Sequence, residues 1–211
     1  MIVLINPNST EAMTAAMVRI ARATAPHMII EGVTNAGGPP AIQGAEDGAA
    51  AVPSMLDHVK QASDKGARAI IIGCFDDTGL DEAREIAACP VLGIGQAAYL
   101  LACACGGRFS VVTTLSVSVP VLEGNIHRYG LDRHLARVRA SEVPVLALES
   151  DPDSATRRVL DEVRAAEAQD GVTSVVLGCG GMGDIAAKAS GHSRAMLIDG
   201  VRAATVMASA L

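Results

Sequence analysis

The sequence predicts an α/β protein of two similar doubly wound lobes, each with a parallel four-stranded sheet flanked by helices. Short apolar runs rich in Val and Ile alternate with longer, Ala-rich, charge-bearing stretches along the chain. This alternation is typical of parallel strands and the helices that cover both faces of their sheet. The same order of elements then recurs in the second half, which indicates two lobes related by pseudo-twofold symmetry.

In the first half, strands are expected at MIVLIN, MIIEGVT, ARAIIIG and VLGIG, and helices at 11–25 and 48–65. In the second half, strands are expected at FSVVTT, ARVRASEVP, TSVVLG and AMLIDG, and helices at 119–129 and 154–169. The crossover is placed near 97–108, and the last residues form a helix that can return to the first half. The expected division is therefore a first lobe of 1–97 with 200–211 and a second lobe of 98–199.

Composition excludes several classes of function. Half of the 211 residues are hydrophobic, which is enough for a substantial core. A net charge of -6 and only 2% aromatic residues argue against a nucleic-acid partner. The first residues, MIVLINPNST, lack a signal-peptide pattern, and no apolar run reaches the roughly 18 residues of a membrane span. We therefore expect a cytoplasmic protein without a membrane partner.

The cysteines and histidines predict neither disulfides nor a metal site. Five cysteines without a C-x-x-C pair indicate free thiols. The five histidines are scattered without metal-ligand spacing, so we expect no metal. They are His27, His58, His127, His134 and His192.

Two pairs of landmarks support the internal repeat. Cys74 and Cys179 differ by 105 in residue number, and so do Asn8 and Thr113. Each of these cysteines also follows an apolar run that ends in glycine, IIIGC and VVLGC. The other three cysteines, Cys89, Cys103 and Cys105, have no counterpart at this offset, and we interpret them as packing residues.

The paired cysteines predict two-base proton transfer. Ligands of parallel sheets bind beyond the carboxyl ends of the strands, so two facing lobes would bring Cys74 and Cys179 to opposite sides of one cleft. Inverting a stereocentre needs one group to remove a proton and another to supply one from the opposite face. A helix N-terminus would lower the thiol pKa from about 8.5, so that a thiol and a thiolate coexist near neutral pH. Backbone donors at Gly180 and Gly181 would stabilise a developing oxygen charge.

Two polar segments near these positions have alternative interpretations. The run from Asn6 to Thr10 is either a turn with a helix cap or a site for a substrate carbonyl. Asp76, Asp77 and Asp184 follow the two cysteines closely. We interpret these carboxylates as first-turn residues that meet a helix dipole, in preference to a catalytic role.

Several motifs together resemble the aspartate/glutamate racemase superfamily, within it the branch of hydantoin and allantoin racemases. The resemblance spans nearly the whole chain. It rests on INPNST, GCFDDTGL, PVLGIGQAA, FSVVTTLSVSVPVLE, RYGL, VPVLALE, VVLGCGGM and LIDG.

The resemblance implies a cofactor-independent racemase of five-membered cyclic ureides, with Cys74 and Cys179 as the catalytic residues. It also implies a homo-oligomer. The expected substrate-binding residues lie beside the two cysteines or after the first strand of each half. They are Asn8, Ser9, Phe75, Thr113, Thr114, Gly180 and Gly181.

The substrate and even the class of function have alternatives. The Phe75-Asp76-Asp77 motif favours 5-substituted hydantoins over allantoin. Aspartate or glutamate racemisation, and isomerisation or decarboxylation of diacids, would need a cation that the motif loops lack. The alternative outside enzymes is a two-lobed small-molecule binding protein.

Overall fold

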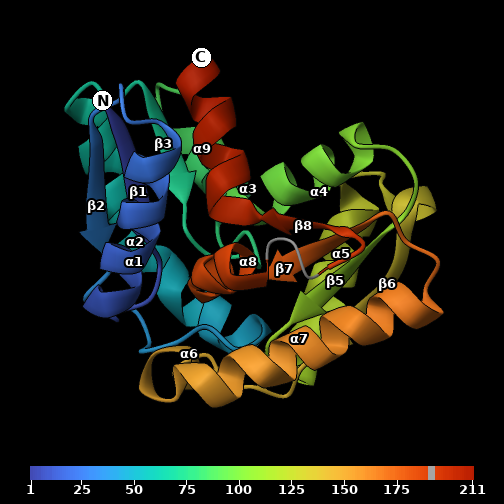
Figure 1. Cartoon of the computed structure of the whole chain (residues 1–211). Helices are drawn as coiled ribbons and strands as arrows, with labels where there is room; N and C mark the ends of the chain where they lie inside the picture. The colour runs from blue at the N-terminus through green and yellow to red at the C-terminus, as the bar shows by residue number, and fades with distance from the viewer. Residues whose placement is uncertain (190–192) are drawn as a thin grey trace.

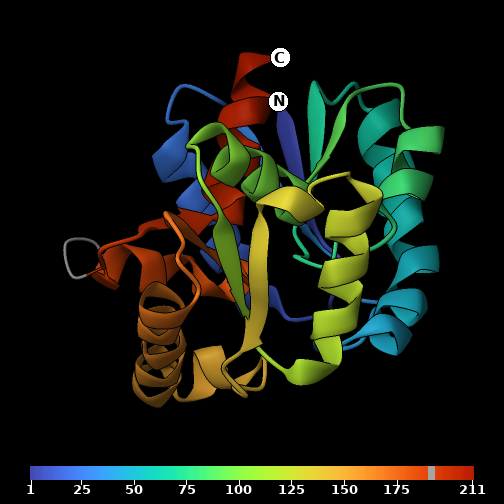
Figure 2. The ribbon, with the colours of Figure 1, turned by 90° about the vertical axis from the view of Figure 1, so that its right-hand side faces the viewer.

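The computed structural model of the protein describes residues 1–189 and 193–211, and it confirms the predicted fold class (Figures 1 and 2). Two four-stranded sheets have the orders β2-β1-β3-β4 and β6-β5-β7-β8, and the pairs in both are parallel. The first sheet contains β1 (Ile2–Asn6), β2 (Ile30–Thr34), β3 (Ala69–Ile72) and β4 (Val91–Gly93). The second contains β5 (Phe109–Thr113), β6 (Leu135–Ala140), β7 (Ser174–Gly178) and β8 (Met196–Asp199).

The helices connect these strands and cover the sheets. The longer ones are α1 (Glu11–Thr24), α2 (Ala45–Asp64), α4 (Ile94–Ala104), α5 (Val119–Arg128), α7 (Pro152–Gln169) and α9 (Gly200–Ala210). The sequence did not predict a helix at α4, where it placed only the crossover between the halves. It also did not predict the short helices α3 (Leu80–Ile86), α6 (Ala147–Ser150) and α8 (Gly183–Ala189). Each of these has seven residues or fewer, which is too short to show a full amphipathic period.

Burial explains the two kinds of strand sequence. The central strands β1, β3, β5 and β7 are buried at every position, and their sequences are almost continuously apolar. The edge strands β2 and β6 are partly exposed and contain charged residues. Central strands of a parallel sheet have helices on both faces, so neither side of the strand faces water.

The sheet registers correct one part of the predicted repeat. Ile2 of β1 pairs with Ala69 of β3, and Phe109 of β5 pairs with Ser174 of β7. Ala69 and Ser174, which correspond to each other in the two halves, differ by 105 in residue number, as the cysteines do. Ile2 and Phe109 also correspond to each other, but they differ by 107. The reason is that the first half has two more residues between its paired strands. The residue of the first half that corresponds to Thr113 is therefore Asn6, the last residue of β1, and the equal offset of Asn8 was a coincidence of numbering.

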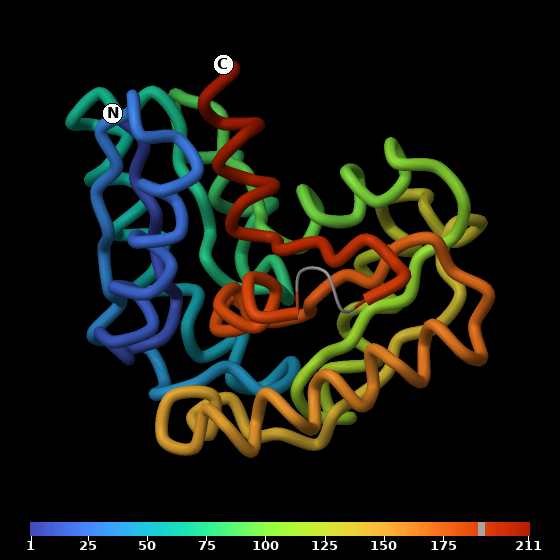
Figure 3. Tube along the Cα trace, in the orientation of Figure 1, coloured from blue at the N-terminus to red at the C-terminus, as the bar shows by residue number. Residues whose placement is uncertain are grey.

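A hydrophobic core joins the two halves. One cluster contains buried residues of both sheets together with those of α4 and α9. In Figures 1 and 3, α9 leaves the second sheet and returns to lie beside the first, where it packs on α1 and α4. Helix α4 spans the expected lobe boundary at residue 97, so the two halves share their central helices. Two further clusters fill the space between the first sheet and α2 and between the second sheet and α7.

All four aromatic side chains of the chain meet in this shared core. The sequence has two Phe, two Tyr and no Trp. The ring of Tyr99 on α4 lies 5.5 Å from Phe75, 5.9 Å from Phe109 and 6.4 Å from Tyr129, measured between centroids. Such pairs add favourable quadrupole contacts to a large buried apolar area. The aromatic cluster thereby fixes the loop after β3 against the second half.

Asp77 links three segments beside this cluster. Its carboxylate accepts hydrogen bonds from the backbone N–H groups of Gly95 and Gln96, at 2.9 and 2.7 Å, and from the Tyr129 hydroxyl at 2.9 Å. A Cβ at position 95 would lie 2.3 Å from the Phe75 carbonyl oxygen, so only glycine permits this approach. We expected Asp77 to interact with the dipole of the helix that directly follows Cys74. Its carboxylate instead accepts hydrogen bonds from the first turn of α4, so this expectation named the wrong helix.

None of the helices in the described part of the chain is long and apolar enough to cross a membrane.

We expect Asp77→Ala to lower the free energy of unfolding by about 1.5–3 kcal/mol, since it leaves one buried and two partly buried donors without their carboxyl acceptor. Tyr129→Phe removes one of the three hydrogen bonds and should have a smaller effect. Denaturant unfolding measures both changes. Lys60→Ala, which removes an exposed ion pair with Asp64, is the control and should leave the midpoint unchanged. Equal stability of Asp77→Ala and the wild type would contradict the linking role.

Candidate active site

The two cysteines singled out by the repeat line one cavity. Cys74 lies in the turn after β3, and Cys179 lies between β7 and the short helix that leads into α8. Both thiols are free, and both line a cavity of about 30 Å³ between the two halves. The lining comes from the strand ends of both sheets, as expected for a parallel α/β fold.

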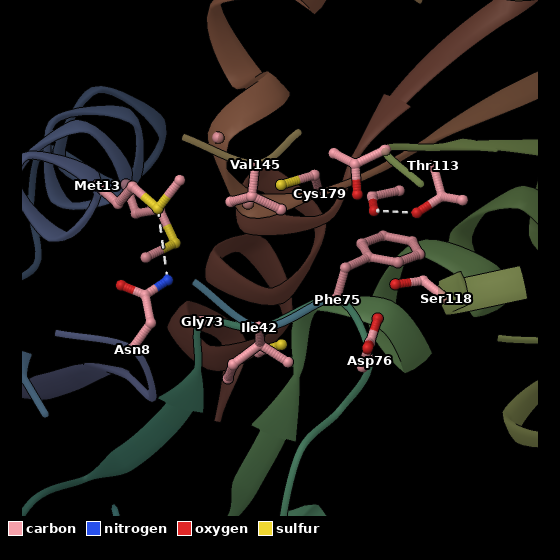
Figure 4. A pocket seen from close by; sticks show the side chains of 16 residues that line it. Asn8, Met13, Ile42, Gly73, Phe75, Asp76, Thr113, Ser118, Val145 and Cys179 are labelled. Atoms are coloured by element: carbon pink, nitrogen blue, oxygen red, sulfur yellow. Dashed lines mark hydrogen bonds between the residues drawn. The ribbon is translucent and has the colours of Figure 1, made fainter. Parts of the chain in front are cut away.

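Most of the expected substrate-binding residues also line this cavity. Asn8, Phe75, Thr113, Thr114, Gly180 and Gly181 are among its lining residues, and Figure 4 shows several of them. Ser9 does not line the cavity, and its backbone N–H is bound to the carbonyl oxygen of Pro39.

The cavity also contains residues that the sequence analysis did not assign to the site. The apolar ones are Met13, Met17, Ile42 and Val145, and the polar ones are Asp76 and Ser118. Met13 and Met17 share one face of α1, but their helical spacing is also that of ordinary core residues. Ile42 and Val145 lie in loops, where sequence periodicity gives no signal. The Asp76 carboxylate was expected to meet a helix dipole, and the structure places it in the cavity wall.

Asn8 presents its amide nitrogen to the cavity. Its Oδ1 accepts hydrogen bonds from Asn6 Nδ2 at 2.8 Å and from the Thr10 backbone N–H at 2.9 Å. Its Nδ2 donates to the sulfur of Met13 at 3.4 Å, which is a weak acceptor (Figure 4). The polar run after β1 therefore closes a turn, and it places Asn8 in the cavity wall; a contact of Asn8 with a substrate carbonyl stays a prediction.

A backbone N–H two residues further along the chain lowers the pKa of each thiol. This N–H belongs to Asp76 for Cys74 and to Gly181 for Cys179. Cys74 Sγ also accepts a hydrogen bond from the Thr78 hydroxyl at 3.3 Å. These donors favour the thiolate form, since they stabilise negative charge on sulfur.

Burial nevertheless raises the pKa of both thiols above the ordinary value of a cysteine. For Cys74 the main cause is burial, followed by the negative charge of Asp76. Burial also raises the pKa of Cys179, to about 11. The expected lowering by a helix N-terminus was wrong for Cys74, because α3 begins only at Leu80. For Cys179 the short helix that follows is outweighed by the loss of water.

The cavity has no cationic side chain in its lining. Its 16 lining residues, all in the described part of the chain, include no Lys, Arg or His. Among the described residues there is also no group of three or more His, Cys, Asp or Glu side chains arranged to hold a metal ion. Of the five histidines considered above, His192 lies outside the described residues.

The chain is similar over its full length to several known proteins. A hydantoin racemase of Rhizobium meliloti is 44% identical over 209 residues, which cover 99% of this chain and 87% of that protein. A hydantoin racemase of a Pseudomonas species is 32% identical, with 99% of this chain and 84% of that protein covered.

Solved structures show the same architecture. An allantoin racemase from Klebsiella pneumoniae superposes with a TM-score of 0.96 at 38% identity, covering 100% of this chain and 86% of that one. A glutamate racemase from Francisella tularensis superposes with a TM-score of 0.72 at 17% identity, covering 99% of this chain and 79% of that one. The second likeness concerns the fold alone.

The family model described as Asp/Glu/Hydantoin racemase matches residues 2–208, nearly the whole chain. The curated relatives that share this span are enzymes that racemise their substrates. The alternative of a non-catalytic binding protein is therefore set aside. The chain belongs to the Asp/Glu/hydantoin racemase family and is an isomerase of the racemase type.

Proposed function

We propose that the protein is a cofactor-independent racemase of 5-substituted hydantoins, in which Cys74 and Cys179 exchange the roles of base and acid. The observation that carries this proposal is a single cavity lined by one thiol from each half. The curated relatives at 44% and 32% identity are hydantoin racemases, which supports the choice of substrate class.

The reaction replaces the proton at C5 by another proton on the opposite face, and it needs no redox partner. The thiolate of one cysteine removes the proton at C5, and the electron pair of the C–H bond moves onto the oxygen of the adjacent carbonyl. The thiol of the other cysteine then gives its proton to C5 from the opposite face, and the electron pair returns. The free Nδ2 hydrogen of Asn8 and the Thr114 and Ser118 hydroxyls in the cavity wall are donors suited to the charged oxygen.

The cavity lining favours a neutral ring over a diacid. A free carboxylate would need a cationic partner once it leaves water, and the lining residues provide none. The carboxyl group of Asp76 would also repel such a substrate. The five-membered ureides avoid this cost because their carbonyl and N–H groups are uncharged.

The apolar part of the wall supports a hydantoin with a hydrocarbon substituent over allantoin. Met13, Met17, Ile42, Phe75 and Val145 surround the cavity with apolar surface. A hydrocarbon 5-substituent gains free energy on this surface, whereas the ureido group of allantoin would lose hydrogen bonds to water. Allantoin, the compound named for the solved relatives, is therefore the second candidate.

Substrate entry requires the cavity to open. A volume of about 30 Å³ holds about two water molecules, whereas the hydantoin ring with its two oxygens has seven non-hydrogen atoms. Loops of both halves meet at the cavity, where the Gln43 side-chain oxygen accepts a hydrogen bond from the Val145 backbone N–H at 3.0 Å. We infer that this contact breaks when substrate enters. The proposal needs no ligand besides the small ureide, and homo-oligomer formation stays a prediction.

The decay of optical rotation tests the reaction directly. We expect single enantiomers of 5-benzylhydantoin and 5-isobutylhydantoin to lose their rotation with purified protein, without added cofactor or metal. Allantoin should react more slowly, since its ureido group is polar. Preferred decay of allantoin would move the assignment to the second candidate. Activity that EDTA removes and a metal ion restores would contradict the cofactor-independent proposal.

We expect Cys74→Ser and Cys179→Ser each to abolish racemisation, because a serine hydroxyl is too weak an acid to replace either partner. In D2O each variant should retain hydrogen exchange at C5 for one enantiomer and lose it for the other, since one thiol faces each side of the ring. Proton NMR measures this exchange. Cys89→Ser, outside the cavity, is the matched control and should behave as the wild type. Full racemisation by either cavity variant would refute the two-base assignment.

The thiol pKa values predict a rise of activity with pH. Because the pKa of both thiols is raised, the thiolate fraction grows as pH increases, and kcat/KM should increase between about pH 7 and pH 9. Thr78→Val removes a donor that stabilises the Cys74 thiolate, so the rise should move to higher pH. Thr24→Val, which removes a hydroxyl on α1 that bonds only its own helix, is the control. A flat profile would contradict thiolate catalysis.

A further inference from the structure

The pseudo-symmetry of the site is broken at one position. Asp76 and Gly181 each lie two residues after their cysteine, and the backbone N–H of each lowers the pKa of that thiol. The backbones of these two residues therefore act on the thiols in the same way. Gly181 has no side chain, so only the first half adds a carboxyl group at this position. Because Gly181 acts on its thiol without a side chain, the carboxyl group of Asp76 is not needed for the same backbone effect.

The Asp76 residue is held at the cavity through its backbone, and one oxygen of its side chain is buried without a partner among the described residues. Its backbone carbonyl accepts a hydrogen bond from Asn125 Nδ2 at 2.7 Å, which fixes the residue between the halves. Its Oδ2 is fully buried and has no hydrogen-bond partner among the described residues. Figure 4 shows the carboxyl group on the same side of the cavity as Phe75 and Ser118.

This arrangement is unfavourable without a ligand. Burial and the charge of Asp77 raise the Asp76 pKa to about 7, and the Asp76 charge in turn raises the pKa of both thiols. A buried polar atom without a partner is uncommon in folded proteins, and its explanations are strain, a bound water or ion, or a donor that a ligand supplies. Of the five such side-chain atoms among the described residues, Asp76 Oδ2 is the one that belongs to a residue of this cavity wall. A ligand donor that binds Oδ2 would give this oxygen a partner and would weaken the effect of the Asp76 charge on the thiols.

We propose that Asp76 binds the substrate, with its carboxylate accepting a hydrogen bond from a ring N–H of the ureide held between Cys74 and Cys179. This inference rests on the proposed function and names the contact that orients the ring. Ureides have such donors beside the reacting carbon, and the other polar groups identified in the lining supply donors for the carbonyl oxygens. The asymmetric pair of Asp76 and Gly181 then orients a ring that is itself asymmetric about its C5 carbon.

The test removes the donor of the hydrogen bond by N-methylation of the ligand, and it removes the acceptor by substitution of Asp76. Racemisation of 5-benzylhydantoin is compared with that of its N1-methyl and N3-methyl derivatives. The proteins are the wild type, Asp76→Asn, which keeps an acceptor oxygen, and Asp76→Leu, which keeps the approximate size without an acceptor. Asp81→Asn, at an exposed carboxyl group a short distance along the chain, is the matched control.

With the wild type, we expect one methyl derivative to lose about ten- to a hundredfold in kcat/KM, the range of a hydrogen bond to a charged group. With Asp76→Leu this loss should shrink to within about threefold, because no acceptor remains. Asp76→Asn should give an intermediate loss, and Asp81→Asn should match the wild type. Calorimetric binding to a Cys74→Ser/Cys179→Ser variant, with and without Asp76→Leu, measures the same contact without turnover.

The outcomes separate this inference from the proposed function. If the wild type racemises the hydantoin and N-methylation has the same effect in Asp76→Leu, the Asp76 contact is refuted and the function stands. If no ureide is racemised, the function is refuted, and the calorimetric comparison decides whether Asp76 still binds a ring N–H. Absence of both turnover and binding would refute the two together.

Discussion

The shared core between the halves is the constraint on which the rest of the structure depends. Helices α4 and α9 cross so closely that a Cβ at Gly200 would lie 2.5 Å from the carbonyl oxygen of Ile94. The aromatic cluster around Tyr99 and the three hydrogen bonds of Asp77 fill the adjoining space. Because these contacts join the loop after β3 to the second half, they also set the distance between the two strand ends that hold the cysteines.

This rigid connection has an electrostatic consequence. Two thiols enclosed between the halves lose contact with water, and their pKa values rise although backbone donors oppose the rise. Burial therefore makes the thiols harder to ionise, and it also excludes water from the site. The exclusion of water strengthens each polar contact with a bound ring. The carboxyl group of Asp76 adds to the same balance, since it disfavours the thiolate until a ligand donor reaches it.

The two halves are alike in topology and unlike in the detail that recognises a substrate. Both sheets have the same strand order, and both cysteines follow the third strand of their half in sequence. The differences lie in loops and single side chains, such as Asp76 opposite Gly181 and the two-residue difference before the paired strands. A symmetric frame is sufficient for proton transfer at two faces, whereas orienting an asymmetric ring requires these departures.

The sequence by itself determined the fold class, the repeat and the two cysteines, because apolar strand runs and a shared offset are local features of the chain. It also indicated most of the cavity-lining residues that follow strand ends. Only the tertiary structure decided that Asp77 caps α4, that Asp76 faces the cavity, that Ser9 lies outside it and that Ile42 and Val145 line it. These outcomes depend on how loops from distant parts of the chain meet and on how burial shifts ionisation, and neither has a periodic signal in the sequence.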